Sequence, residues 1–125
     1  MNKKVIIPTI LFIIVLIFSV MILLENKESN HPVEQSQIIL FYGDGCPHCA
    51  IVENYIKENN VKDKLPFEEK EIYYNQKNEN ELVEKAKLCG IPTNLISIPF
   101  LWEEGKCYVG DQEIIGFFNQ KINEK

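Results

Sequence analysis

Residues 37–49, QIILFYGDGCPHC, decide the fold of this 125-residue chain. The first six of them form a run that is apolar after Gln37 and partly β-branched, which indicates a buried strand. A short loop with two glycines follows. Pro47 then occupies a position in the first turn of the next helix, where proline is tolerated. Apolar residues recur at helical spacing up to Ile56, so a helix is predicted from Pro47 to about Asn59. A buried strand thus leads into a helix that begins beside Cys46.

The rest of residues 37–125 alternates strand and helix patterns in the same way. The expected elements are a strand over 67–74, a helix over 78–88, a strand over 99–102, a turn over 103–106, a strand over 107–109 and a helix from Gly110-Asp111 onward. This order, β-α-β-α-β-β-α, predicts a three-layer α/β domain. The strands that flank the first helix are expected to be parallel, because such crossovers join parallel strands.

The N-terminal segment has a different composition. Residues 5–24 contain no charged residue, and a helix of that length spans about 30 Å, enough to cross a bilayer. Lys3 and Lys4 precede it, which places the N-terminus in the cytoplasm by the positive-inside rule. A cleaved secretory signal is the alternative, although its apolar region is usually only about 7–15 residues long. We therefore predict a single-pass cell-membrane protein with a cytoplasmic N-terminus and transmembrane anchor over 1–24, a polar linker over 25–36 and an extracytoplasmic domain over 37–125.

The charge pattern argues against nucleic acid as a partner. The net charge is −5, and all 13 basic residues are lysines without a basic stripe. Arginine, the preferred residue for bidentate contacts to phosphate, does not occur.

The pair Cys46 and Cys49 is the strongest candidate for chemistry. Backbone N–H groups and the dipole at a helix N-terminus stabilise an anion, and a thiolate is the nucleophile in disulfide exchange. Cys46 lies at that terminus as the exposed candidate, and Cys49, three residues on, would attack the resulting mixed disulfide. Pro47 would support the first turn, and His48 would add partial positive charge near the thiolate.

Two other roles for this pair are open. The two cysteines could form half of a zinc site, but structural zinc usually takes a second close pair of ligands. The remaining cysteines, Cys89 and Cys107, are far apart in sequence, and no second CxxC follows. A purely structural disulfide between Cys46 and Cys49 would close a very small loop and would constrain little of the chain. Redox activity is the preferred hypothesis, with no metal and no cofactor predicted.

The segment FYGDGCPHC resembles the active site of the thioredoxin superfamily, and the strand order of residues 37–125 is similar to that of glutaredoxin. The Pro-His dipeptide between the cysteines resembles that of the DsbA oxidases. The resemblance implies a thioredoxin-like fold and thiol–disulfide exchange with proteins. It leaves open whether the protein oxidises or reduces its substrates.

The same superfamily carries a cis-proline opposite the CxxC motif, and Pro92 and Pro99 both compete for that place. Pro99 is followed by a short apolar strand, a turn at Gly105, a second strand and Gly-Asp, which matches glutaredoxin spacing. The resemblance therefore implies that Pro99 and Ile98 shape the substrate groove. Val109-Gly110-Asp111 stands where glutaredoxins have the Gly-Gly that contacts glutathione, so glutathione use is not implied.

In a glutaredoxin-like fold Cys89 and Cys107 come near the same end of the sheet. A structural disulfide is the preferred interpretation, with two free thiols or a second redox pair as alternatives. Together these expectations describe a membrane-anchored oxidoreductase whose partners are thiol- or disulfide-bearing proteins outside the cytoplasm. A membrane redox protein that recycles it is a further candidate partner. The rival class is a tethered, non-catalytic binding module or metal-binding domain.

Overall fold

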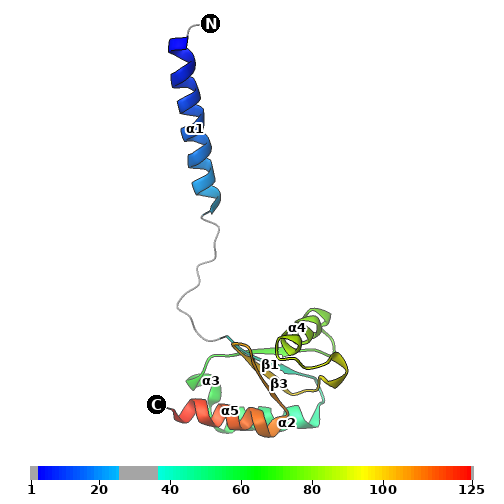
Figure 1. Cartoon of the computed structure of the whole chain (residues 1–125). Coiled ribbons are helices and arrows are strands. Elements are labelled where there is room, and N and C mark those ends of the chain that lie inside the picture. Colours follow the sequence, from blue (N-terminus) through cyan, green and yellow to red (C-terminus); the bar gives the residue numbers. More distant parts are fainter. Residues whose placement is uncertain (1–2, 26–36, 125) are drawn as a thin grey trace. The chain divides into compact units, whose positions relative to one another are not determined.

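The computed structural model describes residues 3–25 and 37–124 (Figure 1). The chain divides into two compact units, Met1–Gln35 and Ser36–Lys125. A polar linker was predicted over residues 25–36. Residues 26–36 of it lie outside the described part of the chain.

The described part of the first unit is the helix α1 (Lys3–Glu25), with Pro8 in its first turns. Crossing a bilayer takes about 20 predominantly apolar residues. Among the described residues, no helix combines the length and the apolar character that a membrane span requires. The predictions of a transmembrane anchor over 1–24 and of a single-pass cell-membrane location are therefore wrong.

The second unit is built on a four-stranded mixed sheet in the order β2-β1-β3-β4. Its strands are β1 (Ile38–Tyr42), β2 (Glu68–Glu71), β3 (Phe100–Glu103) and β4 (Lys106–Val109). β1 pairs with β2 in parallel and with β3 antiparallel, and β3 pairs antiparallel with β4. As an inner strand, β1 is buried along almost its whole length, as its apolar sequence predicts.

Helices cover both faces of this sheet (Figure 1). On one face lie α2 (Pro47–Glu58), α3 (Val61–Lys64) and α5 (Asp111–Asn123); on the other lies α4 (Gln76–Leu88). Successive residues of a strand point to opposite faces, so Ile38 and Leu40 join the core under α2 and α5, whereas Ile39 and Phe41 join the core under α4. β1 therefore contributes to both cores and ends where α2 begins.

These observations correct the predicted fold class, a thioredoxin-like domain preceded by a transmembrane helix. The described residues form a small α/β domain with a four-stranded mixed sheet, and five α-helices in all, none of them able to span a membrane. Two short elements were not predicted: α3 and a 3-10 helix, η1 (Thr93–Leu95). Both are too short to leave a periodic apolar pattern in the sequence.

The strand predicted over 67–74 ends early, at Glu71. The carboxylate of Glu71 accepts hydrogen bonds from the backbone N–H groups of Tyr73 and Tyr74 at 2.7 and 2.9 Å, which turns the chain away from the sheet. α4 then begins at Gln76, two residues earlier than predicted, because the side chain of Asn75 caps it by accepting the N–H of Asn78.

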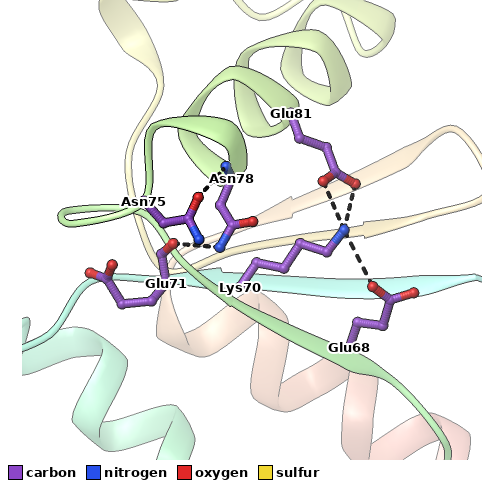
Figure 2. A network of polar contacts seen from close by, with 6 residues as sticks. All are labelled: Glu68, Lys70, Glu71, Asn75, Asn78 and Glu81. Atoms are coloured by element: carbon purple, nitrogen blue, oxygen red, sulfur yellow. Dashed lines mark hydrogen bonds and ion pairs between the residues drawn. The ribbon is translucent and has the colours of Figure 1, made fainter.

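A network of polar contacts attaches α4 to β2 (Figure 2). Asn78 Nδ2 donates to the carbonyl of Glu71 at 2.8 Å, and Lys70 Nζ reaches both carboxylate oxygens of Glu81 at 2.7 Å. Glu68 lies 3.2 Å from the same ammonium group. Desolvation lowers the pKa of Lys70, but hydrogen bonds to Glu81 and Glu68 outweigh it and raise that pKa above the ordinary value. β2 is thus held to the helix that follows it.

Candidate functional site

Cys46 occupies the N-cap of α2, with an extended backbone (φ −74°, ψ 119°). Its Sγ accepts a hydrogen bond from the N–H of Cys49 at 3.2 Å, and its carbonyl accepts the N–H of Ala50 at 3.1 Å. Upstream, the N–H of Cys46 donates to the carbonyl of Gly43, which closes the loop between β1 and α2. The sulfur therefore occupies the place of a capping oxygen, where helix N–H groups stabilise negative charge.

Cys46 and Cys49 form a disulfide, with their Cα atoms 5.2 Å apart. The two cysteines differ in exposure: Cys46 is partly exposed, whereas Cys49 is only 7% exposed. In the reduced protein, the first sulfur would be open to an incoming reagent and the second would be shielded behind it. This asymmetry suits a nucleophile and a resolving thiol.

His48 and Pro47 complete the first turn of α2. Pro47 occupies the first helical position, and both side chains are exposed. His48 Nδ1 lies 3.5 Å from Oδ2 of Asp111, the first residue of α5. Desolvation raises the pKa of Asp111, but the hydrogen bond and charge of His48 outweigh it and lower that pKa below its ordinary value. The start of α5 is thereby paired with His48, one of the two residues between the cysteines.

The loop before Cys46 is packed closely against two other segments. A Cβ atom added to Gly43 would lie 2.4 Å from the ring of Tyr73 and 2.8 Å from Cδ1 of Ile98. The Glu71 carboxylate, which turns the chain after β2, also accepts the N–H of Asp44 at 3.3 Å. Desolvation raises the pKa of Glu71, but the backbone N–H donors of Tyr74, Tyr73 and Asp44 outweigh it and lower that pKa.

The Ile98–Pro99 peptide bond is cis, and Pro99 is buried at the start of β3. The Pro99 carbonyl accepts the N–H of Gly110 at 2.9 Å, which connects it to the start of α5. Ile98 lies beside the loop that carries Cys46, as the contact with Gly43 shows. Pro92, the competing proline, precedes η1 and is exposed.

A cavity of about 750 Å³ adjoins the two cysteines. Cys46, Pro47 and Cys49 contribute to its wall, together with residues of β1, α2, α3 and β2. Ile98 and Pro99, which were expected to form the substrate groove, are not among its lining residues. Cys46 and Cys49 therefore line the cavity, whereas Ile98 contacts the loop that precedes Cys46.

Cys89 and Cys107 form a second disulfide, with Cα atoms 6.2 Å apart. Cys89 caps the C-terminus of α4, and Cys107 lies in β4, so the bridge belongs to the face of the sheet that α4 covers. The described residues contain no free cysteine. Neither of these two cysteines lines the cavity beside Cys46.

The buried carboxylate of the domain lies far from the cysteines along the sheet. Glu103 is 5% exposed and pairs with Ile38 at the beginning of β1, whereas Cys46 follows the end of that strand. Lys121 Nζ lies 2.6 Å from Glu103 Oε1. Glu103 was predicted as a turn residue, and no sequence pattern distinguishes it from its neighbour Glu104.

Sequence reasoning also missed the contacts that Glu71, Tyr73 and Asp111 make around Cys46, because each of them is more than 20 residues away along the chain. Within the described ranges, no group of three or more His, Cys, Asp and Glu side chains is placed to hold a metal ion. The chain matches no protein-family model, and no curated protein is significantly similar to it in sequence.

Proposed function

We propose that this protein is a thiol–disulfide oxidoreductase of the thioredoxin superfamily that exchanges disulfides with protein substrates. One observation carries the proposal: a Cys-x-x-Cys disulfide lies in the first turn of a helix, with the more exposed Cys46 at the N-cap and Cys49 buried behind it. The position supplies N–H groups that stabilise a thiolate, and the difference in exposure separates the roles of the two sulfurs.

In the reducing direction, the Cys46 thiolate attacks a substrate disulfide, forms a mixed disulfide and releases one substrate thiolate. The Cys49 thiolate then attacks Cys46 Sγ, which releases the second substrate thiolate and closes the Cys46–Cys49 disulfide. Two electrons pass from the protein to the substrate. In the oxidising direction the same steps run in reverse, so one geometry serves both. Ile98 borders the loop of Cys46, and with Pro99 it would align an extended substrate segment.

The proposal is tested on the full chain with insulin reduction and with disulfide formation in a reduced protein substrate. Cys46→Ser should abolish both activities, and Cys49→Ser should accumulate the mixed disulfide, which is detected by mass. The double variant Cys89→Ser/Cys107→Ser keeps the proposed redox pair and is the matched control, expected to stay active at temperatures where it is folded. Unchanged activity in Cys46→Ser would refute the proposal.

Two further measurements sharpen the result. The reduction potential of the Cys46–Cys49 pair separates an oxidase from a reductase, because known members range from about −270 mV for thioredoxin to about −120 mV for DsbA. Stoichiometric zinc in the purified chain, lost in Cys46→Ser, would instead support the rival metal-binding module.

A further inference from the structure

The contact between His48 and Asp111 lies beside the proposed redox pair but takes no part in forming or breaking its S–S bonds. His48 Nδ1 lies 3.5 Å from Asp111 Oδ2, and the imidazole side chain is 68% exposed whereas that of Asp111 is 17% exposed. An ionised carboxylate only accepts hydrogen bonds, so Nδ1 carries the proton at this contact. Nε2 is therefore the nitrogen that stays free to exchange a proton with another molecule.

Asp111 is connected to the part of the fold that carries Pro99. It is the first residue of α5, and Gly110 directly before it donates its N–H to the carbonyl of Pro99 at 2.9 Å. His48 lies in the first turn of α2, two residues after Cys46, and it does not line the cavity on the other side of that helix. The imidazole is thus held at the start of α5, on the side of Cys46 where a substrate segment is proposed to align.

A substrate sulfur that Cys46 displaces needs a proton. An ordinary cysteine thiol has a pKa of about 8.5, so it is mostly protonated at neutral pH, and its thiolate takes up a proton once it has departed. Imidazole is the side chain that exchanges protons most readily near neutral pH. Within the ranges 3–25 and 37–124, His48 is the only histidine. It is therefore the side chain best suited to supply that proton beside Cys46.

We propose that His48 delivers a proton to the departing sulfur of the substrate, and that Asp111 positions His48 for this step. The proposal rests on the proposed function and assigns the proton donor of the same site. His48 is the catalytic residue, because its Nε2 meets the leaving sulfur. Asp111 is a positioning residue, because it binds Nδ1 and touches no reacting atom.

In the reducing direction, the Cys46 thiolate bonds to one substrate sulfur while the S–S bond of the substrate breaks. The electron pair of that bond stays on the departing sulfur, which takes the proton from Nε2 of the His48 imidazolium. Cys49 then loses its proton and attacks Cys46 Sγ, and that proton ends on the second departing sulfur. The substrate disulfide gains two electrons and two protons, and the Cys46 thiolate, the Cys49 thiol and the imidazolium together lose them.

The test compares two neutral disulfides that oxidise the reduced full chain and differ in their leaving groups. The thiolate from 2-hydroxyethyl disulfide takes up a proton at sulfur, whereas 4,4′-dithiodipyridine releases an aromatic group that leaves without one. The leaving-group ratio is the rate with dithiodipyridine divided by the rate with 2-hydroxyethyl disulfide. His48→Ala should raise this ratio at least about fivefold, less than the 10²–10⁴-fold of a typical general acid because thiolates are stable leaving groups. Peptide masses after alkylation follow oxidation of Cys46 and Cys49 separately from that of Cys89 and Cys107.

Asp111→Asn keeps the size of the side chain, removes the charge that faces the imidazole and should raise the leaving-group ratio at least about threefold. Glu113→Gln is the matched control. It removes an acidic residue from the same turn of α5, one whose carboxylate accepts the N–H of Val109, and it should keep the wild-type ratio. His48→Ala/Asp111→Asn should have the ratio of His48→Ala alone, because Asp111 acts only through the imidazole.

Added imidazole gives a readout that a purely structural role would not move. At neutral pH it should lower the leaving-group ratio of His48→Ala toward the wild-type value as its concentration rises. An unchanged ratio in His48→Ala, or a raised ratio that imidazole does not lower, would overturn the role of His48. A ratio in the double variant above that of His48→Ala, or an equal rise in Glu113→Gln and Asp111→Asn, would overturn the role of Asp111.

The proposed function survives each of these negative results, because both reagents would still oxidise the Cys46–Cys49 pair. If neither reagent oxidises that pair in the wild-type chain, the proposed function fails, and this inference fails with it.

Discussion

Gly43 is the residue whose identity the site constrains most directly. It lies between β1 and Cys46, and the ring of Tyr73 and the side chain of Ile98 occupy the space that a Cβ atom would need. All three segments around Cys46 therefore meet at one position that has no side chain. A larger residue there must push aside either the aromatic ring or the loop that carries Cys46.

We expect Gly43→Ala to lower the free energy of unfolding by about 1–3 kcal/mol, because overpacking of close contacts costs that much. It should also slow disulfide exchange with 2-hydroxyethyl disulfide, since the displaced loop carries Cys46. Gly116→Ala is the matched control: a Cβ there meets nothing within 4 Å, and alanine favours the helix by about 0.5–1 kcal/mol. Urea unfolding and the rate of disulfide exchange are measured for both variants. Equal free energies of unfolding in the two variants would contradict the close contact between position 43 and Tyr73.

At the scale of elements, α5 is connected to the sheet by a buried charge. Glu103, the last residue of β3, is almost fully buried, and Lys121 near the end of α5 donates to it at 2.6 Å. The hydrogen bond to Glu103 raises the pKa of Lys121 above its ordinary value of 10.5, although desolvation opposes it. This pair lies at the opposite end of β1 from Cys46, so it holds the helix without belonging to the proposed redox site.

Lys121→Met should destabilise the fold by about 1–3 kcal/mol, because it leaves a buried carboxylate without its partner. The double variant Glu103→Gln/Lys121→Met removes that unpaired charge and should be less destabilised than the single one. A raised lysine pKa contributes stability below pH 10.5 and loses it as the pH rises through the folded value. The difference in the free energy of unfolding between wild type and Lys121→Met should therefore become smaller as the pH rises above 10.5. A double variant less stable than Lys121→Met would contradict this account.

At the scale of the whole domain, the Cys89–Cys107 disulfide joins the end of α4 to the edge strand β4. The loop that it closes contains η1, the Ile98–Pro99 bond and β3. A disulfide restricts the unfolded chain more when its loop is longer. The separation is 18 residues for this bridge and 3 for Cys46–Cys49, so the two bridges should differ in their effect on stability.

We expect Cys89→Ser/Cys107→Ser to lower the free energy of unfolding by about 3 kcal/mol, and Cys46→Ser/Cys49→Ser to lower it by about half as much, by loop entropy. Chemical denaturation of the two oxidised variants beside wild type measures both losses. A larger loss in the Cys46/Cys49 variant would show that loop length does not govern the contribution of these bridges.

Sequence patterns predicted much of the second unit because the relevant signals are contiguous. The apolar run of β1, the loop glycines and Pro47 place a strand, a turn and a helix start next to one another, and the structure has β1 at 38–42 and α2 from Pro47. The end of β2 and the start of α4 were predicted less well. They depend on the side chains of Glu71 and Asn75, which bind backbone N–H groups nearby and override the strand and helix patterns.

The sequence by itself determined where Cys46 and Cys49 stand in the fold, because a helix N-cap is a local property of a few consecutive residues. Only the tertiary structure decided what surrounds them. Asp111 beside His48, Tyr73 and Ile98 over Gly43, and the cavity between α2, α3 and β2 bring together residues that are distant along the chain. Those contacts follow from how the helices pack on the sheet, and packing depends on all of the elements at once.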